Sequence, residues 1–166
     1  MKHTPEGKQL TDIILEIFKL SGFLVAEGDV LTKEQGLNSA RWKVLGAISN
    51  TINPLTVSKV ARNMGLTRQA VQRIANEMVT DGLLYFKDNP QHKRAKILVI
   101  TKTGEGIFEE LDKKQILWVN SIADPLKLKD LELTFDVLRE LSARLQPKRG
   151  CRKSLLGISD PVNNSV

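Results

Sequence analysis

The chain has 166 residues, of which 41% are hydrophobic and 27% charged, proportions that are ordinary for a globular protein in water. No apolar run reaches the roughly 20 residues of a membrane span, and the polar first ten residues do not resemble a secretory signal. The single cysteine, Cys151, excludes an internal disulfide framework and a cysteine-based zinc site. We therefore expect a cytoplasmic protein with no membrane contact, no cofactor and no metal site.

The net charge of +6 is unevenly distributed along the chain. Residues 51–103 carry nine basic and three acidic side chains, whereas residues 104–146 carry six basic and nine acidic ones. A basic segment beside an acidic one favours a polyanion as the partner of the middle of the chain only. Charge alone leaves open the alternative that basic residues cluster there by chance.

The first predicted element is a long helix over residues 5–30. Thr4 is a good N-cap, and Pro5 suits the first helical position. Gly22 and Gly28 weaken the second half of this helix. The apolar residues recur at helical spacing, at Leu10, Ile13, Ile14, Ile17, Phe18 and Leu24.

Three shorter helices follow. The second begins at Asn38 or Ser39 and ends in the turn residues 50–54. The third and fourth are separated by a tight turn at Gly65, and the fourth ends near residue 81. Small residues let these two helices approach closely, as a helix-turn-helix requires. Their expected N-caps are Thr56 and Thr67, and the small residues are Ala61 and Ala70.

Residues 83–86 and 97–100 are short apolar runs that predict two β-strands. The ten residues between them are polar and contain the turn pair Asn89 and Pro90. The sequence therefore predicts a β-hairpin with a long basic tip.

Two further helices complete the expected fold. Thr101 caps the fifth, which ends at Asp124 and Pro125, and the sixth covers residues 128–145. The apolar residues of the sixth helix alternate three and four apart, the spacing of paired helices. Because a monomer would expose this seam and the apolar first helix, we expect a homodimer. The expected dimerisation residues are Ile13, Ile17, Trp118, Leu128, Leu131, Phe135, Leu138 and Leu145.

The fourth helix carries the residues that point most directly to function. Once its apolar positions are turned inward, each of the six polar side chains that remain between residues 67 and 76 can donate a hydrogen bond, and none is acidic. Acids follow only at Glu77 and Asp81, away from the proposed reading end. Such side chains read base edges when a helix enters the major groove. The alternative is the solvated face of an amphipathic helix, although such a face usually mixes both charge signs. The expected DNA-binding residues here are Thr67, Arg68, Gln69, Gln72, Arg73 and Asn76.

The hairpin tip adds His92, Lys93 and Arg94 to the expected DNA-binding residues. A basic tip beside a reading helix fits a wing that lies along the DNA backbone or in the minor groove. His92 has no nearby partner for a metal site or pH switch, so a polar wing residue is the simpler interpretation.

These segments resemble the MarR (multiple antibiotic resistance regulator) family of bacterial regulators over about residues 4–146. The resemblance lies in Leu-Thr-Arg-Gln-Ala-Val at 66–71, Asp-Gly-Leu-Leu at 81–84, and Asn-Pro-Gln-His-Lys-Arg-Ala at 89–95. The last motif continues into Leu-Val-Ile-Thr-Lys-Thr-Gly at 98–104. Lys93 and Arg94 fill the basic positions of the family wing, whereas Gln91 and His92 stand where acids are frequent.

The resemblance implies a winged helix-turn-helix fold, mainly α with a small β-hairpin wing. The expected single domain, 1–146, has dimerisation helices at about 4–32 and 104–146, a DNA-binding lobe at about 38–103, and then a basic flexible tail, 147–166. Relatives of this kind bind pseudo-palindromic operators in double-stranded DNA and release them when a small aromatic ligand enters a cleft. Trp42 is a candidate to border such a cleft or to be ordinary core. Family members that sense oxidants use a cysteine near the N-terminus, which Cys151 does not match.

The sequence gives little support to other classes of protein. It lacks the phosphate loop, the metal motif and the nucleophile triad of enzymes, so we expect no catalytic residues. The expected function is a repressor that acts as a homodimer. Two alternatives remain, a winged helix that binds only proteins and a non-specific DNA-binding protein without a ligand.

Overall fold

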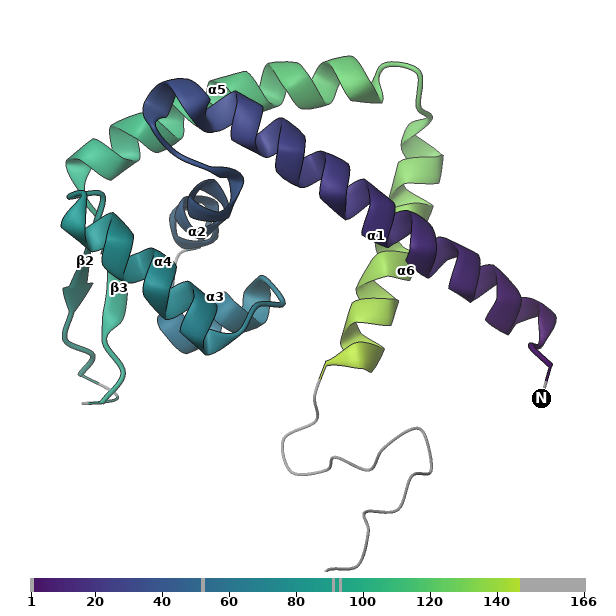
Figure 1. Cartoon of the computed structure of the whole chain (residues 1–166), viewed down its shortest axis with the longest axis horizontal. Helices are drawn as coiled ribbons and strands as arrows, with labels where there is room; N and C mark the ends of the chain where they lie inside the picture. The colour runs from purple at the N-terminus through teal and green to yellow at the C-terminus, as the bar shows by residue number, and fades with distance from the viewer. Residues whose placement is uncertain (1, 52, 91, 93, 147–166) are drawn as a thin grey trace, which may run out of the picture. The chain divides into compact units, whose positions relative to one another are not determined.

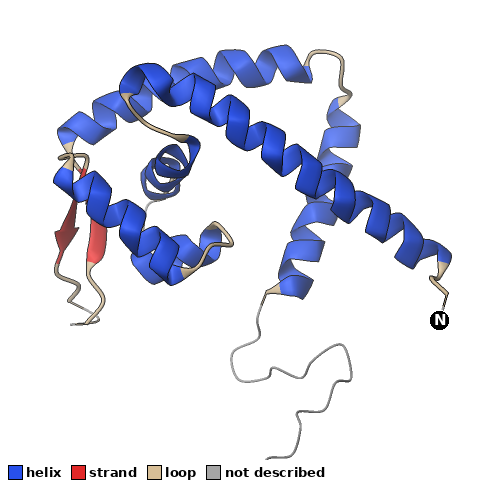
Figure 2. Ribbon diagram, viewed as in Figure 1, coloured by secondary structure: helices blue, strands red, loops and turns tan. Residues whose placement is uncertain are grey.

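The computed structural model describes residues 2–51, 53–90, 92 and 94–146. Helix predominates, and strands occur only in one small sheet (Figure 2). The chain divides into two compact units, Met1–Val119 and Asn120–Val166, with the boundary inside the fifth α-helix. Figure 1 labels most of the elements, which are α1 (Pro5–Thr32), η1 (Lys33–Gln35), α2 (Ser39–Ser49), β1 (Leu55–Thr56), α3 (Val57–Asn63), α4 (Arg68–Thr80), β2 (Leu84–Lys87), β3 (Ile97–Ile100), α5 (Lys102–Ala123) and α6 (Leu128–Leu145).

The expected N-caps are confirmed by their hydrogen bonds. A side-chain oxygen of each cap accepts from a backbone N–H three residues later, which satisfies one of the free donors at the helix start. The cap distances run from 2.9 to 3.4 Å. The capping residues are Thr4, Asn38, Thr56, Thr67 and Thr101.

Helix α1 continues through both glycines and ends two residues beyond the expected end. Gly28 is buried, and a Cβ placed on it would lie 2.7 Å from the Cβ of Ser39. The missing side chain therefore lets α1 pack closely on the start of α2. Two hydrogen bonds fasten this junction: Ser39 N–H donates to Asp29 Oδ1 at 2.7 Å, and Thr32 Oγ1 donates to the carbonyl of Leu37 at 3.1 Å.

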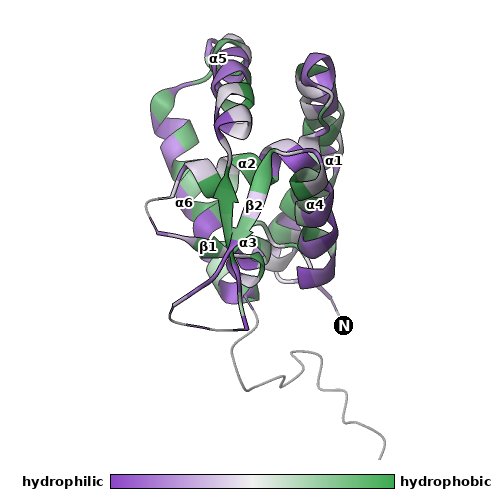
Figure 3. Ribbon diagram, turned by 90° about the vertical axis from the view of Figure 1, so that its left-hand side faces the viewer, coloured by the Kyte–Doolittle hydropathy of each residue, from purple (hydrophilic) through white to green (hydrophobic). Residues whose placement is uncertain are grey.

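The sheet has three antiparallel strands in the order β1-β3-β2. The sequence predicted two of them, and β2 lies one residue later than expected. The short strand β1 was missed because two residues directly before a helix show no alternating pattern. It pairs with β3 through Leu55 and Leu98, both of which are buried. Figure 3 shows that the strands are largely hydrophobic.

The core of the first unit joins α2, α3, α4, the sheet and the start of α5. Gly104 lies where α5 meets the strand region, and Leu111 of α5 is buried. Lys114 donates a hydrogen bond to Glu34, which ties α5 to η1. That hydrogen bond, together with the charge of Lys114, lowers the pKa of the Glu34 carboxyl from its ordinary value.

In the second unit, every residue of α6 except Leu141 is exposed. Across the described ranges of the chain, no helix is both long enough and apolar enough to cross a membrane. The same ranges contain no group of three histidine, cysteine or acidic side chains that could hold a metal ion. Cys151 and the expected tail, 147–166, lie outside the described residues.

Candidate nucleic-acid interface

Helices α3 and α4 form the expected helix-turn-helix. Gly65 has a φ of 64°, a left-handed conformation that glycine adopts without strain, and it turns the chain from one helix into the next. Of the two small residues expected there, Ala61 is buried in the core that both helices share, and Ala70 is half-buried. The inner face of α4 is also buried, at Val71, Ile74, Ala75 and Met78. The opposite face of α4 is therefore the one that a partner can reach.

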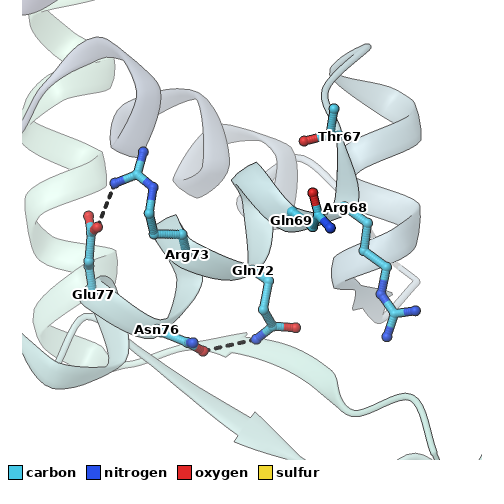
Figure 4. Close-up of a pocket in the computed structure, with 7 residues that line it drawn as sticks. All are labelled: Thr67, Arg68, Gln69, Gln72, Arg73, Asn76 and Glu77. Carbon is cyan, nitrogen blue, oxygen red and sulfur yellow. Dashed lines mark hydrogen bonds and ion pairs between the residues drawn. The ribbon is translucent and has the colours of Figure 1, made fainter.

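All six residues predicted on α4 line one shallow depression on that outer face (Figure 4). The structure adds a seventh, Glu77, which sequence reasoning had placed away from the reading end. The available signal was its spacing, because Glu77 follows Arg73 by four residues, the distance at which helical side chains meet. The depression is thus rich in hydrogen-bonding groups but contains one acid.

Two side-chain pairs organise this face. Gln72 Nε2 donates a hydrogen bond to Asn76 Oδ1 at 2.9 Å, and Arg73 Nη1 donates to Glu77 Oε1 at 2.6 Å (Figure 4). Arg68 points away from both pairs in this view. It forms no ion pair with the residues that the structure describes.

A second hollow separates α4 from the wing. It is lined by Arg68 and Gln72 of α4 and by Arg94 and Lys96 of the wing. The lining also includes the start of α3 and Phe86, and contains no acidic residue among those described. Three cations around one hollow favour the binding of a phosphate group there. The sequence did not predict Lys96 as a site residue, because its presence beside Arg68 in this hollow depends on the path of the hairpin.

The remaining predicted wing residues are less informative. His92 is exposed, and Lys93 lies outside the described residues. Among the expected tip residues that the structure describes, Arg94 lines the hollow beside α4 and His92 does not.

The predicted dimerisation residues fall into two groups. Ile13, Ile17 and Trp118 are half-buried within the chain. The other five are exposed, with Leu128 at 71% and Leu145 at 74%. This second group is Leu128, Leu131, Phe135, Leu138 and Leu145.

Comparison with known proteins agrees with this geometry. The model of the MarR family matches residues 35–95, which include both helices of the helix-turn-helix and most of the wing. Uncharacterized protein Rv2011c of Mycobacterium tuberculosis is 33% identical over 141 residues, which cover 85% of this chain and 97% of that protein. The chain belongs to the MarR family of transcriptional regulators.

Two more distant matches extend the comparison. The transcriptional activatory protein BadR of Rhodopseudomonas palustris is 24% identical over 106 residues, 63% of this chain and 61% of BadR. The crystal structure of CouR from Rhodococcus jostii RHA1, bound to p-coumaroyl-CoA, superposes with a TM-score of 0.73 at 16% identity. The match covers 82% of this chain and 96% of CouR. The expected family and the mainly helical winged fold are thus confirmed.

Proposed function

We propose that this MarR-family chain is a sequence-specific transcriptional regulator that binds DNA through α4 and the wing. The observation that carries the proposal is the pair of adjoining hollows that share Arg68 and Gln72. One hollow offers groups that read bases, and the other offers cations that bind phosphate. A duplex needs both, because phosphate contacts position a protein and base contacts specify the sequence.

The proposed docking places the first half of α4 in the major groove. Arginine pairs with guanine edges there, and glutamine or asparagine with adenine edges. Arg94 and Lys96, from the wing, then face the backbone or the adjacent minor groove. Thr67 and Gln69 complete the proposed reading residues, and His92 and Lys93 are proposed wing contacts.

The proposal includes a symmetric homodimer on a pseudo-palindromic operator. Two copies of α4 related by a two-fold axis fit half-sites about one helical turn apart. The support for a dimer is the exposed apolar surface of α6 together with that of α1, where Phe18 is 70% exposed and Val30 is 69% exposed.

Repression is the proposed effect of operator binding, on the strength of the family resemblance. The relative BadR is named as an activator, so a separate experiment must decide whether this protein represses or activates transcription. Transcription in vitro from a promoter that carries the selected operator should fall when the protein is added. A rise in transcript would indicate an activator in place of a repressor and would leave the DNA-binding proposal unchanged.

Selection of bound fragments from genomic DNA, followed by a salt titration, tests the DNA-binding proposal. We expect one inverted-repeat motif and affinity that falls steeply with salt. Arg94→Ala and Lys96→Ala should weaken binding to all duplexes alike and reduce the salt slope by about one per protomer. Lys113→Ala, which removes an exposed cation of α5, is the matched control and should change neither.

Three results would contradict parts of this proposal. An unchanged slope in both wing variants would remove the wing from the interface. Equal binding to every fragment would favour the non-specific alternative. No duplex binding at all would favour a winged helix that binds only proteins.

A small aromatic ligand that releases the operator is the last part of the proposal. CouR is described with p-coumaroyl-CoA, and the Staphylococcus aureus MarR structure, at 14% identity, with salicylate and kanamycin. In this chain, Trp42 is half-buried and lies beside Gly28 where α1 meets α2. Salicylate and p-coumaroyl-CoA should release bound operator and change tryptophan fluorescence, whereas a ligand-free regulator would show neither effect.

A further inference from the structure

Gln72 and Asn76 are joined along the outer face of α4, at the border of the two hollows. Gln72 is half-buried and lines both hollows, whereas Asn76 is exposed and lines only one. The hydrogen bond from Gln72 Nε2 to Asn76 Oδ1, at 2.9 Å, turns the amide nitrogen of Gln72 toward its neighbour. Figure 4 shows the amide oxygen of Gln72 pointing away from Asn76.

The amide of Gln72 retains two groups for a partner after this bond is made. A primary amide has two N–H donors and one carbonyl acceptor, and the bond to Asn76 occupies one donor. One N–H and the carbonyl oxygen therefore remain available. The major-groove edge of adenine offers the complement, the N7 acceptor and the N6 amino donor.

We infer that Asn76 is a positioning residue, which holds the Gln72 amide in the orientation that reads an adenine. The inference deepens the proposed function and depends on α4 being the reading helix. A glutamine amide rotates broadly about its last torsion, so an unsupported Gln72 presents its donor and acceptor in either order. Fixing that order before DNA arrives reduces the side-chain freedom lost on binding.

Asn76 could have either of two roles, which the sequence alone does not distinguish. As an independent reader, Asn76 would specify a base pair of its own. As a positioning residue, it affects only the base pair that Gln72 reads, and it acts only as a hydrogen-bond acceptor. Aspartate at position 76 retains the acceptor and the side-chain length, whereas alanine removes both.

The test measures the affinity of the full-length protein for a library of operator variants at fixed salt. Gln72→Ala should abolish the adenine preference at one symmetric pair of positions. Asn76→Ala should reduce that same preference at least about fivefold, the low end of what a bidentate contact supplies. Asn76→Asp should retain it, although its added negative charge weakens binding to all sequences alike.

The double variant Gln72→Ala, Asn76→Ala completes the cycle. If Asn76 acts through Gln72, the second substitution has no further effect on base preference. Circular dichroism and thermal unfolding confirm that each variant is folded, which is expected because Asn76 is exposed.

Two outcomes would overturn the inference alone: a wild-type preference that survives Asn76→Ala, or an Asn76→Ala effect at another base pair that persists without Gln72. A wild-type protein that binds DNA with no base preference would overturn the proposed reading function itself. The experiment therefore distinguishes the two failures.

Discussion

Glu77 is an acid within a surface that is otherwise suited to a polyanion. Its carboxylate pairs with Arg73 at 2.6 Å, and both side chains are substantially exposed, at 44% and 70%. Exposed pairs of this kind contribute at most about 1 kcal/mol to stability. The effect of Glu77 should therefore appear in DNA binding, where its charge repels phosphates and occupies the guanidinium of Arg73.

This effect can be tested with Glu77→Gln, which removes the charge and retains the shape. We expect the affinity for unrelated duplexes to rise several-fold, with a smaller gain for the operator, so that the specificity ratio falls. Electrophoretic or fluorescence titrations at fixed salt measure both. Glu109→Gln, at an exposed position on α5, is the control and should change neither. A loss of operator affinity in Glu77→Gln would instead show that Glu77 holds Arg73 in its reading geometry.

Some residue-level features of the site could be predicted from the sequence, and others could not. The outer face of α4 followed from its apolar positions, because burying Val71, Ile74 and Met78 leaves only one face outward. The pairing of Gln72 with Asn76 did not follow, since spacing permits such a bond without requiring it. The hollow between Arg68 and Lys96 depends on the path of the hairpin, which the sequence does not specify.

At the scale of elements, Gly104 determines how closely α5 approaches the strand region. A Cβ at this position would lie 2.4 Å from the carbonyl oxygen of Leu83 and 2.8 Å from Cγ1 of Ile100. The Leu83 carbonyl cannot move freely, because it accepts a hydrogen bond from the Thr101 N–H at 3.0 Å.

Gly104→Ala should therefore lower the free energy of unfolding by about 1–3 kcal/mol, the usual cost of overpacking. Gly106→Ala is the matched control on the same helix, since nothing lies within 4 Å of its added Cβ. That substitution should stabilise the protein by up to about 1 kcal/mol through helix propensity. Denaturant unfolding of both variants measures the difference, and equal stabilities would contradict the close packing at Gly104.

The helices and strands that were predicted are those with strong signals in their own local sequence. Caps and helical periods located every long helix, because those signals lie within a few residues of one another. The sequence treated Gly28 only as a weak helix former, whereas in the structure its missing side chain accommodates Ser39. Strand β1 was missed because its pairing with β3 joins residues about 40 positions apart.

At the scale of the whole molecule, the described residues leave a large amount of apolar surface exposed to water. On α6, Leu128, Phe135 and Leu145 are 71%, 60% and 74% exposed. Patches of this kind are rare on monomeric proteins in water, because burying apolar area is favourable by about 25 cal/mol per Å². The spacing of three and four residues between the apolar positions of α6 predicted which residues form the patch. The second copy that we expect to cover it is a property of the assembly, which no local pattern specifies.

Two substitutions on α6 test the dimer with the same chemical change. Leu138→Asp places a charge in the seam, where an uncompensated carboxylate is costly to bury, so the dimer should dissociate or unfold. Leu133→Asp makes that change on the opposite side of the helix, at a residue already 65% exposed, and should leave the dimer intact. Sedimentation equilibrium at micromolar concentration measures the mass of each variant. A wild-type chain that sediments as a stable monomer would contradict the prediction. Dissociation in Leu133→Asp but not in Leu138→Asp would place the interface on the other face of α6.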